Sequence, residues 1–280
     1  MMKHSGCDNR ILWLNRLGPV IGLVFVFALF AAIGPESFSS ARNIQTIARQ
    51  TAIVGTAALG MTIVIVAGGI DLSIGSVIAL STVVIAITLD RGFDPALAAL
   101  VGVLAGALAG LTNGLLITRL RVVPFIITLG MLLGVRGIAK GLANEQKVNC
   151  PFTWLNDLLA VLPPEQRWMI LPPGVWIMIV LAVAVGVLLR YTRFGRHAFA
   201  IGSSEQTARL SGIDVRRMKI LVYSACGAFA GLAGVIQFSR LTVGDPTVAG
   251  GLELDTIAAV VIGGGSLSGG EGSVLGSLRG

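Results

Sequence analysis

The sequence predicts an all-α membrane protein, a polytopic bundle of transmembrane helices. Hydrophobic residues make up 54% of its 280 residues and charged residues 12%, about half of the charged share that is usual in a soluble domain. The apolar residues form long continuous runs, which suit helices, whereas a β-barrel would need short alternating segments. Glycine contributes 37 residues, nearly twice the usual share of about 7%, and this predicts helices that pack backbone to backbone.

About eight apolar runs are long enough to cross, or nearly cross, the hydrocarbon core of a bilayer. Residues 1–16 form a short tail before them, and residues 17–280 form one transmembrane domain. The first run is too long for a signal peptide and has no clean cleavage site, so we expect it to be a span. The runs lie at about Leu17 to Ile33, Ile47 to Ala67, Ile74 to Leu89, Ala96 to Thr118, Pro124 to Leu142, Gly174 to Leu189, Ile220 to Phe238, and Ile257 onward.

The basic residues between the spans indicate that the N-terminus lies in the cytoplasm. In that orientation twelve Lys and Arg residues fall on the cytoplasmic side and six on the outer side, as the positive-inside rule expects. Arg42 and Arg49, in a predicted outer loop, run against this bias. The long outer loop contains Trp154 and Trp168, which suit a membrane interface. Because the net charge of +7 flanks apolar runs and forms no aromatic-interleaved stripe, we expect no nucleic acid partner.

Glycines recur at every fourth residue along the fourth span, and the same spacing appears twice elsewhere. Small residues with this spacing let two helix backbones approach closely. Two interpretations are open: packing between helices of one subunit, which is the commoner use in polytopic bundles, and a dedicated dimer seam. Gly102, Gly106, Gly110 and Gly114 form a glycine ridge along the fourth span. The other pairs with this spacing are Gly130 with Gly134 and Gly227 with Gly231.

The sequence lacks the patterns of a catalytic or metal site. Its two histidines, His4 and His197, lie outside the predicted spans, so a serine in the membrane would have no histidine base. Neither HExxH nor a cysteine ligand spacing is present. Residues 265–270 have the GxxxxG spacing of a phosphate loop, but Glu271 and Gly272 follow where Lys and Ser or Thr are needed. We therefore expect a transport subunit with no ATPase site, catalytic residue, metal or cofactor of its own.

Charged residues in or beside the apolar zones are few: Asp71, Glu253, Asp255, Arg136 and Lys140. An ion-coupled carrier usually keeps carboxylates at mid-membrane, whereas these acidic residues lie near the ends of predicted spans. Asp71 has two interpretations, a functional charge or a helix cap. Because Gly68 and Gly69 can end one helix while Asp71 or Ser73 caps the next, the capping interpretation is favoured.

The longest cytoplasmic segment in this orientation, residues 190–219, is also the most basic. Within it, "SSEQTARLSGI" predicts a short helix. Ser203 or Ser204 can cap its N-terminus, Glu205 lies favourably in its first turn, and Gly212 can provide a left-handed stop. An ordinary positive-inside loop needs no capped helix, so docking of a partner is favoured over a plain loop.

Three stretches carry a resemblance to a known family: "GMTIVIVAGGIDLSIGSVIAL", "TRFGRHAFAIGSSEQTARLSGIDVRRMKILVYSACGAFAGLAGVI" and "GLELDTIAAVVIGGGSLSGGEGSVLGSL". They resemble, in family order, the inner-membrane permeases of bacterial ATP-binding-cassette importers for monosaccharides, the ribose and xylose type. The likeness begins at about Phe38. It implies a multi-pass inner-membrane permease that pairs with a second copy or a paralogue. It also implies a periplasmic sugar-binding protein and separate cytoplasmic subunits that bind ATP and drive alternating access.

The resemblance also assigns residues. The docking helix for the ATP-binding subunit comprises Ser204, Glu205, Ala208, Arg209, Leu210 and Gly212. The family motifs near the spans, to which the resemblance gives no detailed role, contain Gly69, Asp71, Leu72, Ser73, Glu253 and Asp255.

The resemblance further implies about ten spans, and family members usually continue past "GGGSLSGGEGSVLG" with more apolar sequence. This chain stops at "SLRG", so we expect that about two spans of about 20 residues each are missing. Three functions are therefore compared. The permease subunit of an ATP-driven sugar importer is favoured, and the alternatives are an ion-coupled secondary carrier and a truncated membrane protein that does not transport.

Overall fold

The computed structural model describes residues 7–162 and 169–279. The described part is helical, with one isolated antiparallel bridge between Val148 and Gly244. The predicted all-α class is therefore confirmed. Trp154, which is 52% exposed, begins a short helix outside the long ones, whereas Trp168 lies outside the described residues.

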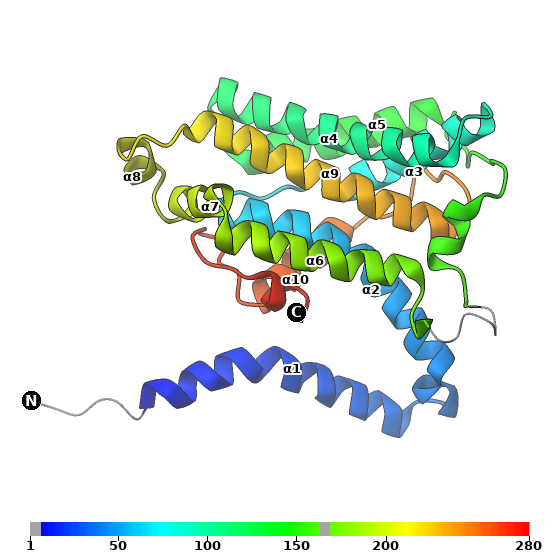
Figure 1. Ribbon diagram of the computed structural model, residues 1–280, viewed down its shortest axis with the longest axis horizontal. Coiled ribbons are helices and arrows are strands. Elements are labelled where there is room, and N and C mark those ends of the chain that lie inside the picture. The colour runs from blue at the N-terminus through cyan, green and yellow to red at the C-terminus, as the bar shows by residue number, and fades with distance from the viewer. Residues whose placement is uncertain (1–6, 163–168, 280) are drawn as a thin grey trace, which may run out of the picture.

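The described helices pack as a bundle of long, roughly parallel and antiparallel rods (Figure 1). Five of them, α2, α4, α5, α6 and α9, are long and apolar enough to cross a membrane, and shorter apolar stretches cover Ile21–Ile33 and Ile74–Asp90. The elements are α1 (Cys7–Ile33), η1 (Glu36–Ser39), α2 (Ala41–Val66), α3 (Ile74–Asp90), α4 (Pro95–Leu120), α5 (Pro124–Leu142), η2 (Trp154–Leu159), α6 (Pro173–Tyr191), α7 (Arg193–Ser203), α8 (Glu205–Leu210), α9 (Val215–Leu241), α10 (Leu252–Ile262) and α11 (Val274–Ser277).

Both ends of the chain differ from the predicted spans. Helix α1 already begins at Cys7, ten residues before the predicted first span. The last apolar run is not one continuous helix, because α10 ends at Ile262. Gly264, Gly269 and Gly270 then follow with positive φ angles, a conformation that glycine adopts far more readily than other residues. A glycine-rich loop and the short helix α11 thus stand where the second half of that span was expected.

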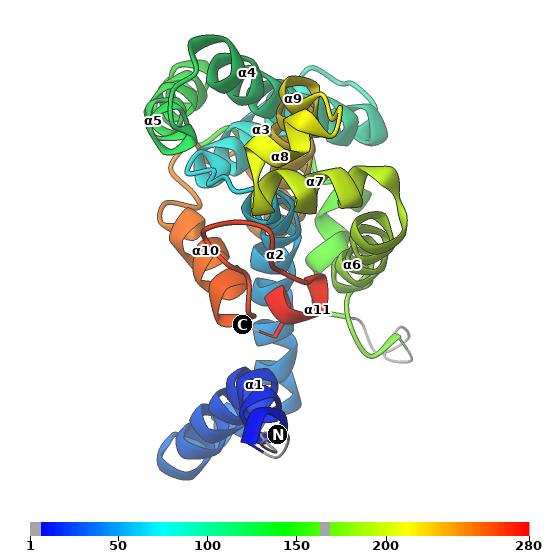
Figure 2. The same ribbon diagram turned by 90° about the vertical axis from the view of Figure 1, so that its left-hand side faces the viewer.

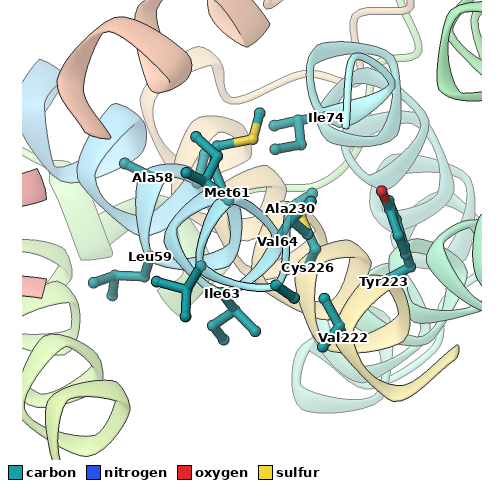
Figure 3. Packing of buried hydrophobic residues seen from close by; sticks show 14 of the residues in the cluster. Ala58, Leu59, Met61, Ile63, Val64, Ile74, Val222, Tyr223, Cys226 and Ala230 are labelled. Carbon is teal, nitrogen blue, oxygen red and sulfur yellow. The ribbon is translucent and has the colours of Figure 1, made fainter. Parts of the chain in front are cut away.

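Helix α2 forms the centre of the bundle together with α9. Leu59, Met61 and Ile63 of α2 are completely buried, and Figure 3 shows Val64 of the same helix next to Cys226 and Ala230 of α9. A helix that neighbours surround on all sides is apolar all round, which explains the mainly apolar sequence of residues 52–66, the buried part of α2. Helices α5 and α6, by contrast, keep large exposed apolar faces.

Glycines bring α4 and α9 into direct backbone contact. A Cβ atom on Gly106 would overlap the carbonyl oxygen of Gly227 and lie 2.9 Å from the Cα atom of Gly231. A Cβ atom on Gly110 would overlap the carbonyl oxygen of Tyr223. Two of the glycine repeats therefore face each other within one chain, as small residues at a close helix crossing do.

The remaining glycines of the spacing pattern divide between packed and open positions. A Cβ atom on Gly114 would lie 2.7 Å from the Cα atom of Ile220 in α9, and Gly102 faces side chains of α3. Gly130 and Gly134 on α5 would meet no atom within 4 Å. The ridge of α4 thus packs inside the subunit, whereas the glycines of α5 lie on an open face.

The bundle has two ends, which we name by their short helices. The α8 end carries α7, α8, the α4–α5 connection at residues 121–123 and the loop 263–273, and the η2 end carries residues 143–162 and 169–172. Figure 1 shows the α8 end on the left, the η2 end on the right, and α1 separate from the bundle. Figure 2 looks at the α8 end and shows α5 and α10 on one side of α2, with α6 on the other.

Candidate functional site

The short helix expected in the basic segment is present as α8. The Ser204 side chain accepts a hydrogen bond of 3.2 Å from the backbone N–H of Thr207, which is the usual N-cap contact. Gly212 has a φ angle of +81° and ends the helix in the left-handed conformation. Both ends of α8 are therefore set by residues next to it in the sequence.

Ion pairs hold α8 against the start of α9. The Nζ atom of Lys219 lies 2.6 Å from one carboxylate oxygen of Glu205, and the Nη2 atom of Arg209 lies 2.9 Å from the other. The hydrogen bond from Lys219, helped by Arg209, lowers the pKa of Glu205, so this carboxylate is ionised at neutral pH. Ala208 is buried, whereas Leu210 is 84% exposed. Helix α8 is thus held in place by its ion pairs and exposes the apolar side chain of Leu210 at its end.

A cavity of about 740 Å³ lies beside α8, between this helix and the α4–α5 connection. More basic than acidic side chains line it, and apolar residues from the ends of α4, α5 and α9 complete the wall. The α8 end therefore offers both a projecting helix and a hollow next to it. The charged lining residues are Arg121, Arg209, Arg216, Lys219, Glu205 and Asp214.

Helix α7, which packs against α8, was not predicted from the sequence. The Thr192 hydroxyl accepts a hydrogen bond of 3.4 Å from the N–H of Gly195 and caps the helix. Gly195 packs on the backbone of Leu189 in α6, and Gly202 packs on the carbonyl of Val66 at the end of α2. The cap residue was the available sequence signal, but the two glycine contacts depend on the fold.

Asp71 lies in the turn between α2 and α3, and its side chain is buried. Its Oδ1 atom accepts hydrogen bonds from the backbone N–H of Ser73 at 2.9 Å and from the Ser73 hydroxyl at 2.6 Å. The side-chain amide of Asn113 in α4 donates to Asp71 Oδ2 at 3.3 Å and to the Ser73 hydroxyl at 2.9 Å. Gly68, at φ +78°, follows the end of α2. Asp71 therefore connects the α2–α3 turn to α4.

The other two motif residues of this turn contribute packing. A Cβ atom on Gly69 would overlap the hydroxyl of Tyr223, and Leu72 is buried. Ser73 is the residue before α3, but its own side chain makes no capping bond to the helix. Asp71 binds the N–H of Ser73, which precedes the helix, so neither predicted cap makes a hydrogen bond to an N–H of the first turn of α3.

Glu253 and Asp255 lie together in the first turn of α10, away from the Asp71 group. Asp255 is exposed. One carboxylate oxygen of Glu253 accepts a 3.3 Å hydrogen bond from the N–H of Gly251, and the other is buried without a hydrogen-bond partner in the described part of the chain. Gly75 leaves the space that this second oxygen occupies. Within the described residues, no hydrogen bond or ion pair joins this pair to Asp71.

Arg136 of α5 has a role that sequence analysis does not reveal. Its Nη1 atom donates hydrogen bonds to the carbonyl oxygens of Pro246 at 3.0 Å and Val248 at 2.6 Å. Both carbonyls belong to the non-helical residues 242–251, between α9 and α10. The only sequence signal was a charged residue in an apolar run, because its partners are 110 and 112 positions away.

Comparison with known proteins identifies the class. Residues 43–280 match the family described as branched-chain amino acid transport system / permease component, and the chain belongs to this family of membrane permease components. It is 40% identical to the ribose import permease protein RbsC of Escherichia coli K12, over 96% of this chain and 83% of the relative. It is 42% identical to RbsC of Bacillus subtilis 168, over 95% of this chain and 82% of the relative.

A relative named for a different sugar has a similar sequence identity to this chain. The L-arabinose ABC transporter permease protein AraH of Azospirillum brasilense is 37% identical over 95% of this chain and 77% of the relative. No solved structure matches the chain. The family resemblance carried by the three sequence stretches is therefore confirmed.

Proposed function

We propose that this chain is the permease subunit of an ATP-driven importer for a monosaccharide in the bacterial inner membrane. The observation that carries the proposal is α8, a capped helix with an exposed tip, in a chain that belongs to a family of permease components. The relatives named for ribose and L-arabinose import support a sugar as the substrate class.

The proposed division of labour places energy conversion outside this chain. A separate ATP-binding subunit docks on α8 and in the cavity beside it, so that the permease itself needs no cofactor. A periplasmic sugar-binding protein delivers the substrate to the η2 end, and a second copy or a paralogue completes the permease. The basic residues of α7, α8 and the first turn of α9 support a cytoplasmic α8 end under the positive-inside rule, which also puts the N-terminus in the cytoplasm.

The docking assignment is tested by Glu205→Arg combined with Gly212→Pro. The arginine places a third cation beside Lys219 and Arg209, and proline cannot adopt the φ of +81° at position 212. We expect that the ATP-binding subunit no longer co-purifies and that uptake of labelled sugar falls to background, with normal amounts of the permease in the membrane.

The control is Glu271→Arg, the same charge reversal at an exposed position of the α8 end outside α8. This variant should keep both co-purification and uptake. If the double variant retained both, α8 would not be the docking helix. If wild-type uptake proceeded without any ATP-binding subunit, an ion-coupled carrier would replace the importer as the better explanation.

A further inference from the structure

Non-helical backbone lies at the depth of the membrane interior between α9 and α10. The N–H of Asp245 donates a 3.2 Å hydrogen bond to the hydroxyl of Thr82, near the middle of α3. Arg136, which binds the carbonyls of Pro246 and Val248, is twelve residues along α5 from Pro124. At 1.5 Å per residue this is about 18 Å from the start of the helix, past the middle of a core of about 30 Å.

Part of this irregular segment is exposed on the surface of the single chain. Thr247, Gly250 and Gly251 are exposed. Unpaired peptide groups in hydrocarbon cost several kcal/mol each, and irregular backbone at membrane depth occurs where it is covered by protein or lines a water-filled cavity. This surface therefore does not face lipid.

Helix α5, which contacts the irregular segment through Arg136, also has an open stripe of glycines. Gly130, Gly134, Gly137 and Gly141 would each accept a Cβ atom without meeting another atom within 4 Å. Figure 2 shows α5 and α10 on the same side of the bundle, with the segment that links α9 to α10 passing between them. The glycines define no site by themselves, but they leave open space along one stripe of α5, beside exposed apolar side chains such as Leu133 and Ile138.

Charged groups of alternating sign follow the segment from the η2 end to mid-depth. Lys147, in the connection at the η2 end, lies 3.4 Å from the carboxylate of Asp245. Arg136 follows, bound to two carbonyls of the segment, and Glu253 comes next in the first turn of α10. Two cations and two carboxylates give no net charge. Ionisable residues inside a membrane commonly mark the route of a substrate.

We infer that α5, residues 242–251 and the first turn of α10 line a water-filled substrate path, which a second copy of the chain closes from the other side. Arg136 and Glu253 bind hydroxyl groups of the substrate at mid-depth. The inference rests on the proposed function and adds the place and chemistry of substrate contact. A neutral polyhydroxylated molecule suits this path because it gains from both donors and acceptors and needs no net charge.

The two residues divide the contacts by their chemistry. Arg136 uses Nη1 for the backbone carbonyls, and its other guanidinium N–H groups are donors for hydroxyl oxygens. Among the described residues, one carboxylate oxygen of Glu253 has no hydrogen-bond partner, and it accepts a hydrogen bond once the first turn of α10 moves away from Gly75. Binding at this position is therefore coupled to a shift of α10.

Water access is tested by cysteine labelling in the complete complex. In a background with the natural cysteines replaced, Thr247→Cys and Gly250→Cys should react at least ten times faster with a membrane-impermeant thiol reagent than Val183→Cys. Val183 is 65% exposed on α6, on the other side of the bundle. Transported sugar should slow the reaction at positions 247 and 250. The inference would be overturned if positions 247 and 250 reacted as slowly as position 183, or if sugar did not slow their reaction.

Substrate contact is tested by Arg136→Gln and Glu253→Gln. Each should lower sugar uptake at least tenfold and shift the preference between two sugars, while ATP hydrolysis stimulated by the loaded binding protein continues. The control is Asp255→Asn, which removes a charge from the same turn but on the opposite flank of α10, since two residues turn a helix by about 200°. Equal loss in the control would assign the effect to α10 stability and contradict the contact. Absence of uptake by the wild-type complex, with labelling intact, would instead refute the proposed sugar import.

Discussion

At the scale of single residues, Asp71 shows how a carboxylate can be held inside an apolar bundle with no cationic partner in the described part of the chain. Its oxygens receive hydrogen bonds from the Ser73 N–H, the Ser73 hydroxyl and the Asn113 amide. Buried polar groups are tolerated when such partners satisfy them. The arrangement connects the α2–α3 turn to α4, and it favours a structural role over a transported or coupled charge.

This interpretation predicts different outcomes for two substitutions of Asp71. Asp71→Asn keeps an oxygen that accepts the Ser73 N–H and should preserve uptake. Asp71→Leu leaves buried donors of Ser73 and Asn113 without an acceptor and should lower the free energy of unfolding by about 1–3 kcal/mol. Thermal unfolding of the purified protein and uptake in cells measure the two effects. Lost uptake in a normally stable Asp71→Asn protein would demonstrate a charge role instead.

At the scale of elements, the close crossing of α4 and α9 depends on glycines that face each other. We expect Gly110→Ala to lower the free energy of unfolding by about 1–3 kcal/mol, because the new methyl group would overlap the carbonyl oxygen of Tyr223. Gly186→Ala in α6 is the matched control, since no atom lies within 4 Å of its Cβ position and alanine favours a helix by about 1 kcal/mol. Melting temperatures in detergent compare the two. Equal stability of both variants would rule out a tight α4–α9 contact.

The elements also differ in how far the sequence predicts them. Helix α8 was predictable because its cap at Ser204 and its stop at Gly212 are local. The break after Ile262 was not, since the same glycine spacing that packs α4 occurs in the loop that ends α10. The contacts of Arg136 were equally hidden, because they require α5 and residues 242–251 to meet in space. Local chemistry thus predicted the short helix α8, whereas the contacts of the proposed mid-membrane site required the tertiary structure.

At the scale of the whole molecule, α9 connects the two functional regions. Its second turn contains Lys219, which binds Glu205 of α8, and its last residue, Leu241, leads into residues 242–251. The helix has 27 residues, which is about 40 Å. A displacement of α8 by an ATP-binding subunit therefore has a direct route along one helix to the segment that we assign to the substrate path.

This arrangement requires that the two ends of the bundle lie on opposite sides of the membrane, with the α8 end in the cytoplasm. Leu210→Cys and Phe152→Cys test it, because these residues are 84% and 80% exposed at the α8 end and the η2 end. With the natural cysteines replaced, an impermeant thiol reagent should label position 152 in cells whose outer membrane is permeabilised, and position 210 only in inverted membrane vesicles. Labelling of position 210 from the outside would reverse the topology. It would then put α8 beyond the reach of any cytoplasmic ATP-binding subunit, so both the docking assignment and the direction of the proposed path would fail together.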